Sequence, residues 1–175
     1  TLFCADPTRR LQETLKGLRA AVFFSATLSP LGYFRDLLGG NTDDLAHSFD
    51  SPFSGAQMRI SVLGHDVSFK GRTDSLSVVA RAVADHIAGN PGNHLIFCPS
   101  MQYLAELESE LTGLLTGVSF FVQTSSMDEK QRASFLSKFA SGSNSVGLAV
   151  MGGIFAEGID LPGDRLVGVT VIGVG

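Results

Sequence analysis

Strand-length apolar runs alternate with amphipathic segments along this chain, and this alternation limits its fold more than any other feature. The runs are short and largely continuous, as in strands buried on both faces. Between them, apolar residues recur three or four apart, the spacing of one helix face. This alternation predicts an α/β fold, with a mostly parallel sheet and helices on both faces. The predicted strands cover residues 2–4, 21–24, 59–63, 94–98, 118–122, 146–151 and 166–172, and the predicted helices 6–17, 29–38, 74–88, 101–111 and 128–140.

Three of the predicted helices begin with a capping signal. Asp6-Pro7 and Ser29-Pro30 each place a capping side chain before a proline suited to the first turn. Ser126 to Glu129 predicts a capping box, in which Glu129 bonds back to the backbone of the cap residue. Polar residues 41–58 and 68–72 predict a long loop and a second exposed loop.

Composition predicts one domain and gives no sign of a membrane segment. At 175 residues, 44% of them hydrophobic, the chain can bury a sizeable core. No apolar run reaches the roughly 18 residues of a membrane span, and no signal peptide is recognisable. The sequence has no initiator methionine and both its ends fall in or beside apolar runs, so we expect a piece of a longer protein.

Net charge and cysteine content limit which ligands and metals the chain is expected to bind. A net charge of −4 gives nucleic-acid binding no support, although a local groove can be positive on an acidic domain. Cys4 and Cys98 suit a reduced, intracellular protein with buried thiols. Two cysteines alone cannot form a tetrahedral zinc site or hold an iron–sulfur cluster, and the four histidines show no metal-binding spacing. We therefore predict no metal site.

The stretch Gly152 to Gly163 carries the strongest functional signal. It reads Gly-Gly-Ile-Phe-Ala-Glu-Gly-Ile-Asp-Leu-Pro-Gly and lies between two predicted strands. Its four glycines let the backbone turn tightly and approach a ligand closely. Glu157 and Asp160 are three residues apart, close enough to serve one site. The alternative is an irregular strand connection with solvated acids.

Further polar clusters follow three other apolar runs. They are Ser25-Ala26-Thr27, Pro99-Ser100-Met101 and Gln123-Thr124-Ser125. In parallel sheets ligands bind at the carboxyl ends of strands, where hydroxyls and free backbone N–H groups suit phosphate oxygens. Ser100 alone also fits a helix N-cap. The sequence contains no Walker A loop, no G-x-S-x-G elbow and no G-x-G-x-x-G after a strand.

Several of these blocks together match one family. Phe24 to Pro30 matches an S-A/G-T-L-S-P block, and Leu95 to Ser100, with Tyr103, resembles an apolar strand ending in F-P-S. Gly152 to Asp160 matches G-G-x-F-S-E-G-I-D, the most specific of the three. In this order they resemble motifs III, IV and V of the second motor domain of superfamily 2 helicases of the DinG/XPD type. Ser51-Pro52-Phe53 and Leu161 to Asp164 also fit, the latter the bacterial DinG branch, and the resemblance spans roughly residues 1–172.

The resemblance implies a single RecA-like domain over residues 1–175 that forms half of a motor. Such helicases clasp ATP and Mg²⁺ between two RecA-like domains and track single-stranded DNA across both. The first domain carries Walker A, Walker B and often an iron–sulfur cluster, and motif VI supplies an arginine to the transition state. None of these motifs occurs in this sequence, and the spacing of Arg165 does not make it a substitute. We expect the chain alone to bind no cofactor and to be inactive.

The resemblance also implies partners and roles. The expected partners are single-stranded DNA and the first RecA-like domain of the same polypeptide, in the bacterial cytoplasm and away from membranes, with 5′-to-3′ unwinding and DNA repair as the function of the full protein. The nucleotide cleft and its coupling are expected to use Ser25, Thr27, Gly153, Glu157, Gly158 and Asp160. The DNA contacts are expected to use Ser100, Met101, Tyr103, Thr124 and Gly152. Tyr103 and Phe155 are candidate base stackers, with core packing as the alternative for Phe155.

Two other classes of protein remain compatible with the residues of this sequence. One is the second domain of an RNA helicase, which stimulation of the parent protein by RNA rather than DNA would reveal. The other is a non-motor α/β binding or scaffold module. A Walker A loop upstream and Q-x-x-G-R-x-x-R downstream in the parent reading frame would exclude that module.

Overall fold

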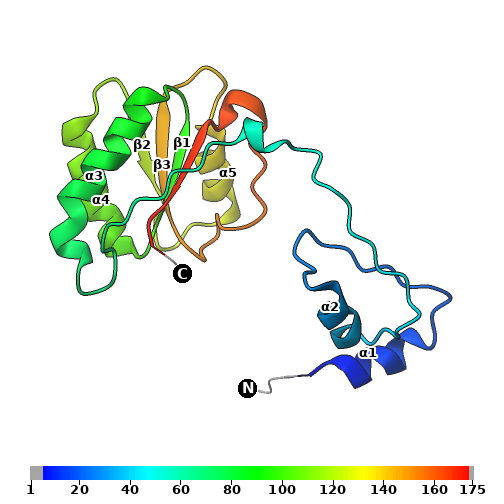
Figure 1. The fold of residues 1–175 in the computed structure, drawn as a ribbon. Helices are drawn as coiled ribbons and strands as arrows, with labels where there is room; N and C mark the ends of the chain where they lie inside the picture. Colours follow the sequence, from blue (N-terminus) through cyan, green and yellow to red (C-terminus); the bar gives the residue numbers. More distant parts are fainter. Residues whose placement is uncertain (1–5, 174–175) are drawn as a thin grey trace. The chain divides into compact units, whose positions relative to one another are not determined.

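A parallel β-sheet of four strands forms the centre of residues 62–173 in the computed structural model, which describes residues 6–173 (Figure 1). The strand order is β2-β3-β1-β4, and every neighbouring pair is parallel. Ile96 of β1 lies between Leu148 of β3 and Thr170 of β4. The predicted α/β class is confirmed. The strands are β1 (His94–Cys98), β2 (Ser119–Val122), β3 (Ser145–Val150) and β4 (Gly168–Val171).

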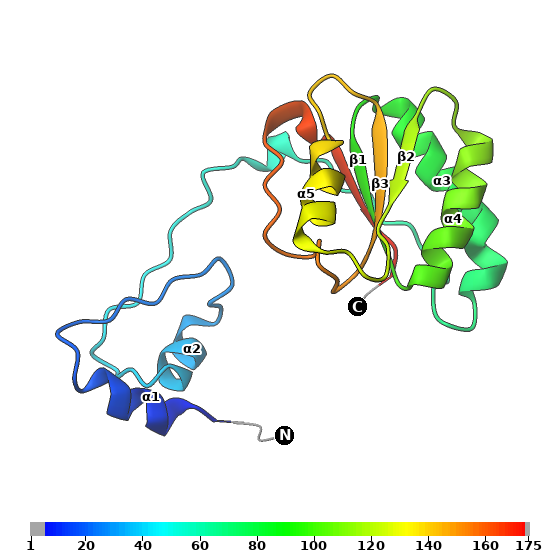
Figure 2. The ribbon, with the colours of Figure 1, turned by 180° about the vertical axis from the view of Figure 1, so that it is seen from behind.

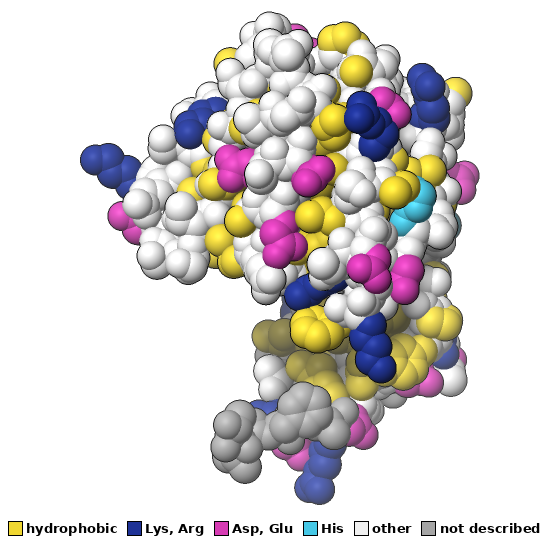
Figure 3. All heavy atoms as spheres, turned by 90° about the vertical axis from the view of Figure 1, so that its left-hand side faces the viewer, with side chains coloured by type: hydrophobic (Ala, Val, Ile, Leu, Met, Phe, Trp, Pro, Cys, Tyr) yellow, Lys and Arg dark blue, Asp and Glu magenta, His cyan; other side chains and the backbone are white. Residues whose placement is uncertain are grey.

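Helices cover both faces of this sheet, as predicted (Figures 1 and 2). On one face lie α3 (Arg72–Gly89) and α4 (Met101–Leu114), and on the other lies α5 (Glu129–Ser137). Successive strand residues point to opposite faces. Ile96 therefore packs in the core below α3 and α4, whereas Leu95 packs with the phenylalanines of α5. The outer face of α3 and α4 carries scattered charges of both signs, as solvated helix faces do (Figure 3).

The cap of α5 differs from the predicted one. Its cap residue is Asp128, whose carboxylate accepts from the Gln131 N–H at 2.7 Å, while the Gln131 side chain accepts from the Asp128 N–H at 2.9 Å. The predicted box of Ser126 with Glu129 is therefore wrong by two residues, because Gln131 reaches back from the third helical position whereas Glu129 occupies the first. Ser100 does cap α4, since its hydroxyl accepts from the Tyr103 N–H at 3.2 Å.

Residues 6–61 form a separate unit that holds two short helices and one 3₁₀ turn. Asp6 accepts from the Thr8 N–H at 2.9 Å, but the cap residues of the two helices are Pro7 and Pro30, neither with a side-chain cap bond. The caps predicted at Asp6 and Ser29 are therefore wrong by one residue, and Ser29 precedes a cis Pro30. Residues 41–54 are loop, as predicted. The elements are α1 (Thr8–Leu15), α2 (Leu31–Leu37) and η1 (Gly55–Gln57).

Two predicted strands are absent from the described part of the chain. Residues 21–24 and 59–63 are irregular and exposed, with Phe24 90% and Val62 90% exposed. A continuous apolar run indicates a segment suited to burial, but a strand also needs a neighbour for its backbone hydrogen bonds. Among residues 6–173 neither run has such a neighbour. The strand predicted at residues 2–4 lies outside the described residues.

Candidate functional site

The glycine-rich stretch connects β3 to β4 and starts at the carboxyl end of the sheet. Gly152, Gly158 and Gly163 have φ values of 68°, 69° and 65°, a region that side chains other than glycine rarely adopt. Gly153 serves a different purpose. A Cβ there would lie 3.0 Å from the Val150 carbonyl oxygen and 3.2 Å from Gln123 Nε2. The tight turns predicted for these glycines are present, and their close approach to a ligand stays a prediction.

Three of the predicted polar clusters come together at one edge of the sheet. Gln123, just after β2, donates its N–H to the Leu148 carbonyl at 2.8 Å and accepts from the Val150 N–H at 3.0 Å through its side chain. Met151, just after β3, donates to the Cys98 carbonyl at the end of β1, at 2.9 Å. The ends of β2, β3 and β1 are therefore joined side by side, as parallel strands require.

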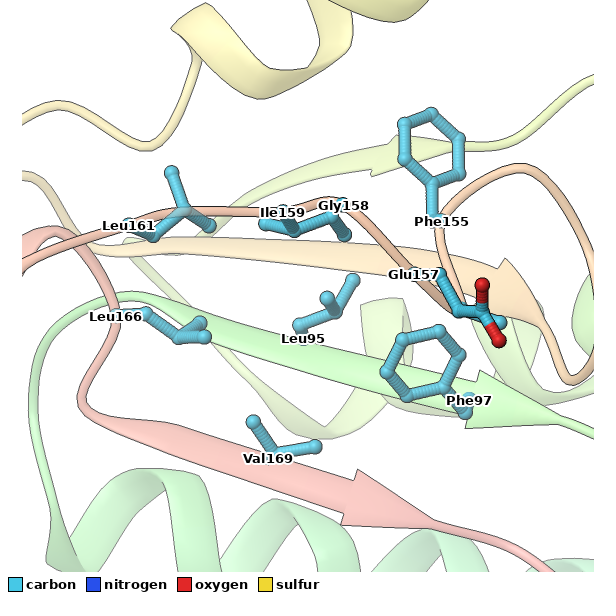
Figure 4. Close-up of a pocket in the computed structure, with 10 residues that line it drawn as sticks. Leu95, Phe97, Phe155, Glu157, Gly158, Ile159, Leu161, Leu166 and Val169 are labelled. Carbon is cyan, nitrogen blue, oxygen red and sulfur yellow. The ribbon is translucent and has the colours of Figure 1, made fainter. Parts of the chain in front are cut away.

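The two acids of the loop are exposed. Neither the Glu157 nor the Asp160 carboxylate has a hydrogen-bond or ion-pair partner within residues 6–173. Figure 4 shows Glu157 beside Phe97 of β1, at the border of a hollow of about 390 Å³. Two carboxylates without partners can accept hydrogen bonds from a ligand hydroxyl or pair with an incoming cation.

The hollow itself is mainly apolar. Its floor is formed by side chains of β1 and β4, and its wall by residues 155–161 of the glycine-rich stretch (Figure 4). Val169 on β4 is 51% exposed and leaves one side of the floor open to solvent. The lining residues are Leu95, Phe97, Phe155, Ala156, Glu157, Gly158, Ile159, Leu161, Leu166 and Val169.

The residues expected to contact DNA differ in accessibility. Thr124, Gly152 and Met101 are exposed, and Ser100 is half-buried because it caps α4. Tyr103 is only 1% exposed and belongs to the core cluster formed by residues of α3, α4, β1 and β3. A ring buried in this way has no free face for a base, so a direct contact of the Tyr103 side chain with DNA does not fit this structure.

Phe155 is also a core residue. It is 1% exposed and stacks on Phe135 of α5, with 4.2 Å between the ring centroids. Of the two roles weighed for Phe155, core packing is the one that its position supports.

Ser25 and Thr27 lie in the unit of residues 6–61. Both are exposed, and their hydroxyl oxygens are 3.1 Å apart. The Thr27 N–H also donates to the Ser25 hydroxyl, at 3.2 Å. The coupling role expected of these two residues stays a prediction.

Sequence reasoning missed an arginine that holds the loop. Arg132 of α5 donates to the main-chain carbonyls of Ile154 and Gly158, at 3.1 and 3.2 Å. No sequence pattern pointed to it, because the contacts join residues 22 and 26 positions apart and main-chain acceptors leave no mark on residue type.

The sheet unit offers neither a reactive cysteine nor a cluster of metal-binding side chains among its described residues. Burial raises the pKa of the Cys98 thiol to about 12, so this cysteine stays protonated and is a poor nucleophile. Within residues 6–173 no group of three or more histidine, cysteine, aspartate or glutamate side chains is placed to hold a metal ion. In the same range no helix has both the length and the apolar character of a membrane span.

The fold and the joined strand ends define an α/β domain of the kind that binds ligands at the carboxyl edge of a parallel sheet. Residues 83–175 match the family model of the helicase C-terminal domain, of the DinG/XPD type. This match covers more than half of the chain, and the chain belongs to that family. It includes the blocks at β1 and at the glycine-rich stretch but not Ser25 to Thr27. A comparison with curated proteins found no match.

Proposed function

We propose that this chain is the C-terminal motor domain of an ATP-dependent DNA helicase, and that it supplies one wall of the nucleotide cleft and part of the single-stranded DNA path. The observation that carries the proposal is the loop from Gly152 to Gly163. It begins beside the joined ends of β1, β2 and β3 and holds two exposed carboxylates without partners. Membership of the helicase C-terminal domain family supports the motor context.

The nucleotide side of the proposal rests on Asp160 and Glu157. ATP bound with Mg²⁺ supplies the free energy for movement along DNA. In this chain, Asp160 accepts a hydrogen bond from a ribose hydroxyl or orients an arginine from elsewhere in the polypeptide. Glu157 faces the same cleft, and the backbone at Gly153 and Gly158 comes close to the ligand. The exposure of both carboxylates supports this assignment, because neither is engaged within the described chain.

The DNA side of the proposal rests on small groups at the same edge of the sheet. Thr124, Gly152 and Met101 are exposed there, and the Ser100 hydroxyl is half-buried. Hydroxyl and backbone N–H groups bind phosphate oxygens without reading bases, which suits a motor that moves along any sequence. The proposal therefore predicts DNA binding with little sequence preference.

The test is Asp160→Ala in the full-length protein. We expect DNA-stimulated ATP hydrolysis to fall by at least about tenfold, a loss of about 1.4 kcal/mol of transition-state stabilisation, with an unchanged melting temperature because Asp160 makes no contact that holds the fold. Asp85→Ala is the matched control, since Asp85 is an exposed aspartate on α3 with no proposed role. Turnover at the wild-type rate in Asp160→Ala would overturn the assignment. Stimulation by RNA alone would favour an RNA helicase.

A further inference from the structure

Helix α5 is joined to the glycine-rich stretch at two points, and the segment just after the stretch is joined to the α5 region at a third. Arg132 lies near the start of the helix and reaches the first half of the loop. Phe135, one turn further on, stacks on Phe155. Just after the stretch, Arg165 donates to the carbonyls of Phe139 and Leu136, at 3.0 and 3.4 Å. Residues 154–158 of the loop are thus attached to a regular element rather than free in solvent.

The Arg132 guanidinium uses all of its nitrogens in this attachment. Nε donates to the Ile154 carbonyl at 3.1 Å, and Nη2 donates to the carbonyls of Gly158 and Glu157 at 3.2 and 3.5 Å. Nη1 pairs with Glu129, one turn earlier on the helix, at 3.4 Å. The side chain is 21% exposed. A planar guanidinium held at several sites has little freedom, so it fixes the carbonyls that it contacts.

These contacts lie on both sides of the turn at Gly158, which determines where the Glu157 and Asp160 side chains point. Gly158 has the left-handed φ of 69° and lies between Glu157 and Asp160. Within residues 6–173 the carbonyls of Glu157 and Gly158 receive no main-chain hydrogen bond. Arg132 is therefore the group that holds the two peptide units on either side of this turn.

We propose that Arg132 is a positioning residue, which fixes the backbone of residues 154–158 and thereby the direction in which Glu157 and Asp160 leave the loop. The inference rests on the function proposed above, since the two acids matter only if they face a ligand. Arg132 itself touches main-chain carbonyls and Glu129, and each of its three nitrogens already donates a hydrogen bond. It acts through the loop and not on the ligand.

Arg165 offers a matched comparison within the same interface. It also donates to main-chain carbonyls from a half-buried position, but these carbonyls belong to Leu136 and Phe139. Its hydrogen bonds do not reach residues 154–158. Loss of either arginine removes hydrogen bonds between the α5 region and the connection from β3 to β4, whereas only loss of Arg132 releases the turn between the acids.

The experiment compares Arg132→Ala, Arg132→Lys and Arg165→Ala in the full-length protein. We expect Arg132→Ala to lower kcat for DNA-stimulated ATP hydrolysis about 10- to 100-fold, the loss that misplacing a functional group by about 1 Å produces. Arg165→Ala should lower the melting temperature about as much as Arg132→Ala does, but it should leave kcat within about twofold of the wild-type value. Arg132→Lys should give an intermediate kcat, because an ammonium group can hold one carbonyl but not the fork of contacts.

A second measurement tests directly how firmly the loop backbone is held. Hydrogen exchange at the amides of residues 154–161 should be faster in Arg132→Ala than in the wild type, while exchange in β3 should be unchanged. If Arg132→Ala does not fold, the same two readouts on Arg132→Lys decide the question. Equal losses of kcat in the Arg132 and Arg165 variants, or unchanged loop exchange, would overturn the positioning role. Wild-type turnover in Asp160→Ala would instead overturn the proposed function, so the two failures are distinguishable.

Discussion

Gly147 shows how a single residue decides the packing on the α5 side of the sheet. It lies within β3, where a Cβ would be 2.7 Å from Phe139 Cζ and 2.9 Å from Phe121 Cε2. The rings of Phe121, Phe135 and Phe139 pack edge to face, with 4.7 to 5.9 Å between their centroids. The absence of a side chain at Gly147 lets this aromatic group sit against the strand, and Phe155 of the candidate site packs on the same group.

We therefore expect Gly147→Ala to destabilise the chain by about 1 to 3 kcal/mol, because the added methyl group overpacks the aromatic group. Gly113→Ala is the control. Gly113 lies in α4, with no atom within 4 Å of the position of an added Cβ. There the same substitution should stabilise by about 0.5 to 1 kcal/mol. Urea unfolding of the two variants measures both effects, and equal midpoints would contradict the packing explanation.

At the scale of elements, α5 depends on its cap more than the other helices of the sheet unit do. It has 9 residues, and only Phe135 among them is fully buried. The reciprocal bonds between Asp128 and Gln131 satisfy donors at its first turn that would otherwise lack partners. Because Arg132 is anchored on the same turn, the cap also supports the attachment of the glycine-rich stretch.

Asp128→Ala should accordingly cost about 1 kcal/mol of stability and speed hydrogen exchange at the start of α5. Ser126→Ala separates the observed cap from the one that sequence alone predicted. Ser126 is exposed and makes no hydrogen bond within residues 6–173, so its loss should change stability by less than about 0.5 kcal/mol. Thermal unfolding of the two variants is the measurement. A larger effect at Ser126 than at Asp128 would show that the helix starts two residues earlier.

At the scale of the whole molecule, the described chain consists of two units, and the family match lies in the second. Residues 83–175 carry the match, and the sheet with its helices occupies 72–171 of the unit that begins at Val62. The first unit, residues 6–61, leaves large apolar side chains exposed, including Phe24 and Phe53. That the whole chain forms one RecA-like domain stays a prediction.

In solution, the isolated chain is expected to hydrolyse no ATP, because its sequence has no Walker A loop to hold the phosphates. We expect it to bind single-stranded DNA weakly and to lose about tenfold in affinity between about 50 and 200 mM salt, as a small number of phosphate contacts requires. A coupled ATPase assay and fluorescence anisotropy with labelled DNA are the measurements. Turnover by the isolated chain would contradict the view that it is half of a motor.

The strands β1, β2 and β3 and the helices α3 and α4 could be predicted from sequence because their patterns match their environment. Leu95 to Cys98 is a continuous apolar run and lies in a central strand, paired on both sides. The buried residues of α3, such as Val79 and Val83, follow the helical spacing that predicted them. Residues 21–24 show the same kind of pattern but have no strand beside them, so there the prediction is wrong.

The sequence by itself determined the periodicity of the sheet unit, the presence of tight turns in its glycine-rich stretch and the type of residue that each strand end presents. These are local properties, set by spacing and by backbone freedom. Only the tertiary structure decided the strand order, the burial of Tyr103, and the attachment of Arg132 to carbonyls 22 and 26 residues away. Those features depend on which distant segments pack together, and a main-chain carbonyl accepts the same hydrogen bond whatever side chain its residue carries.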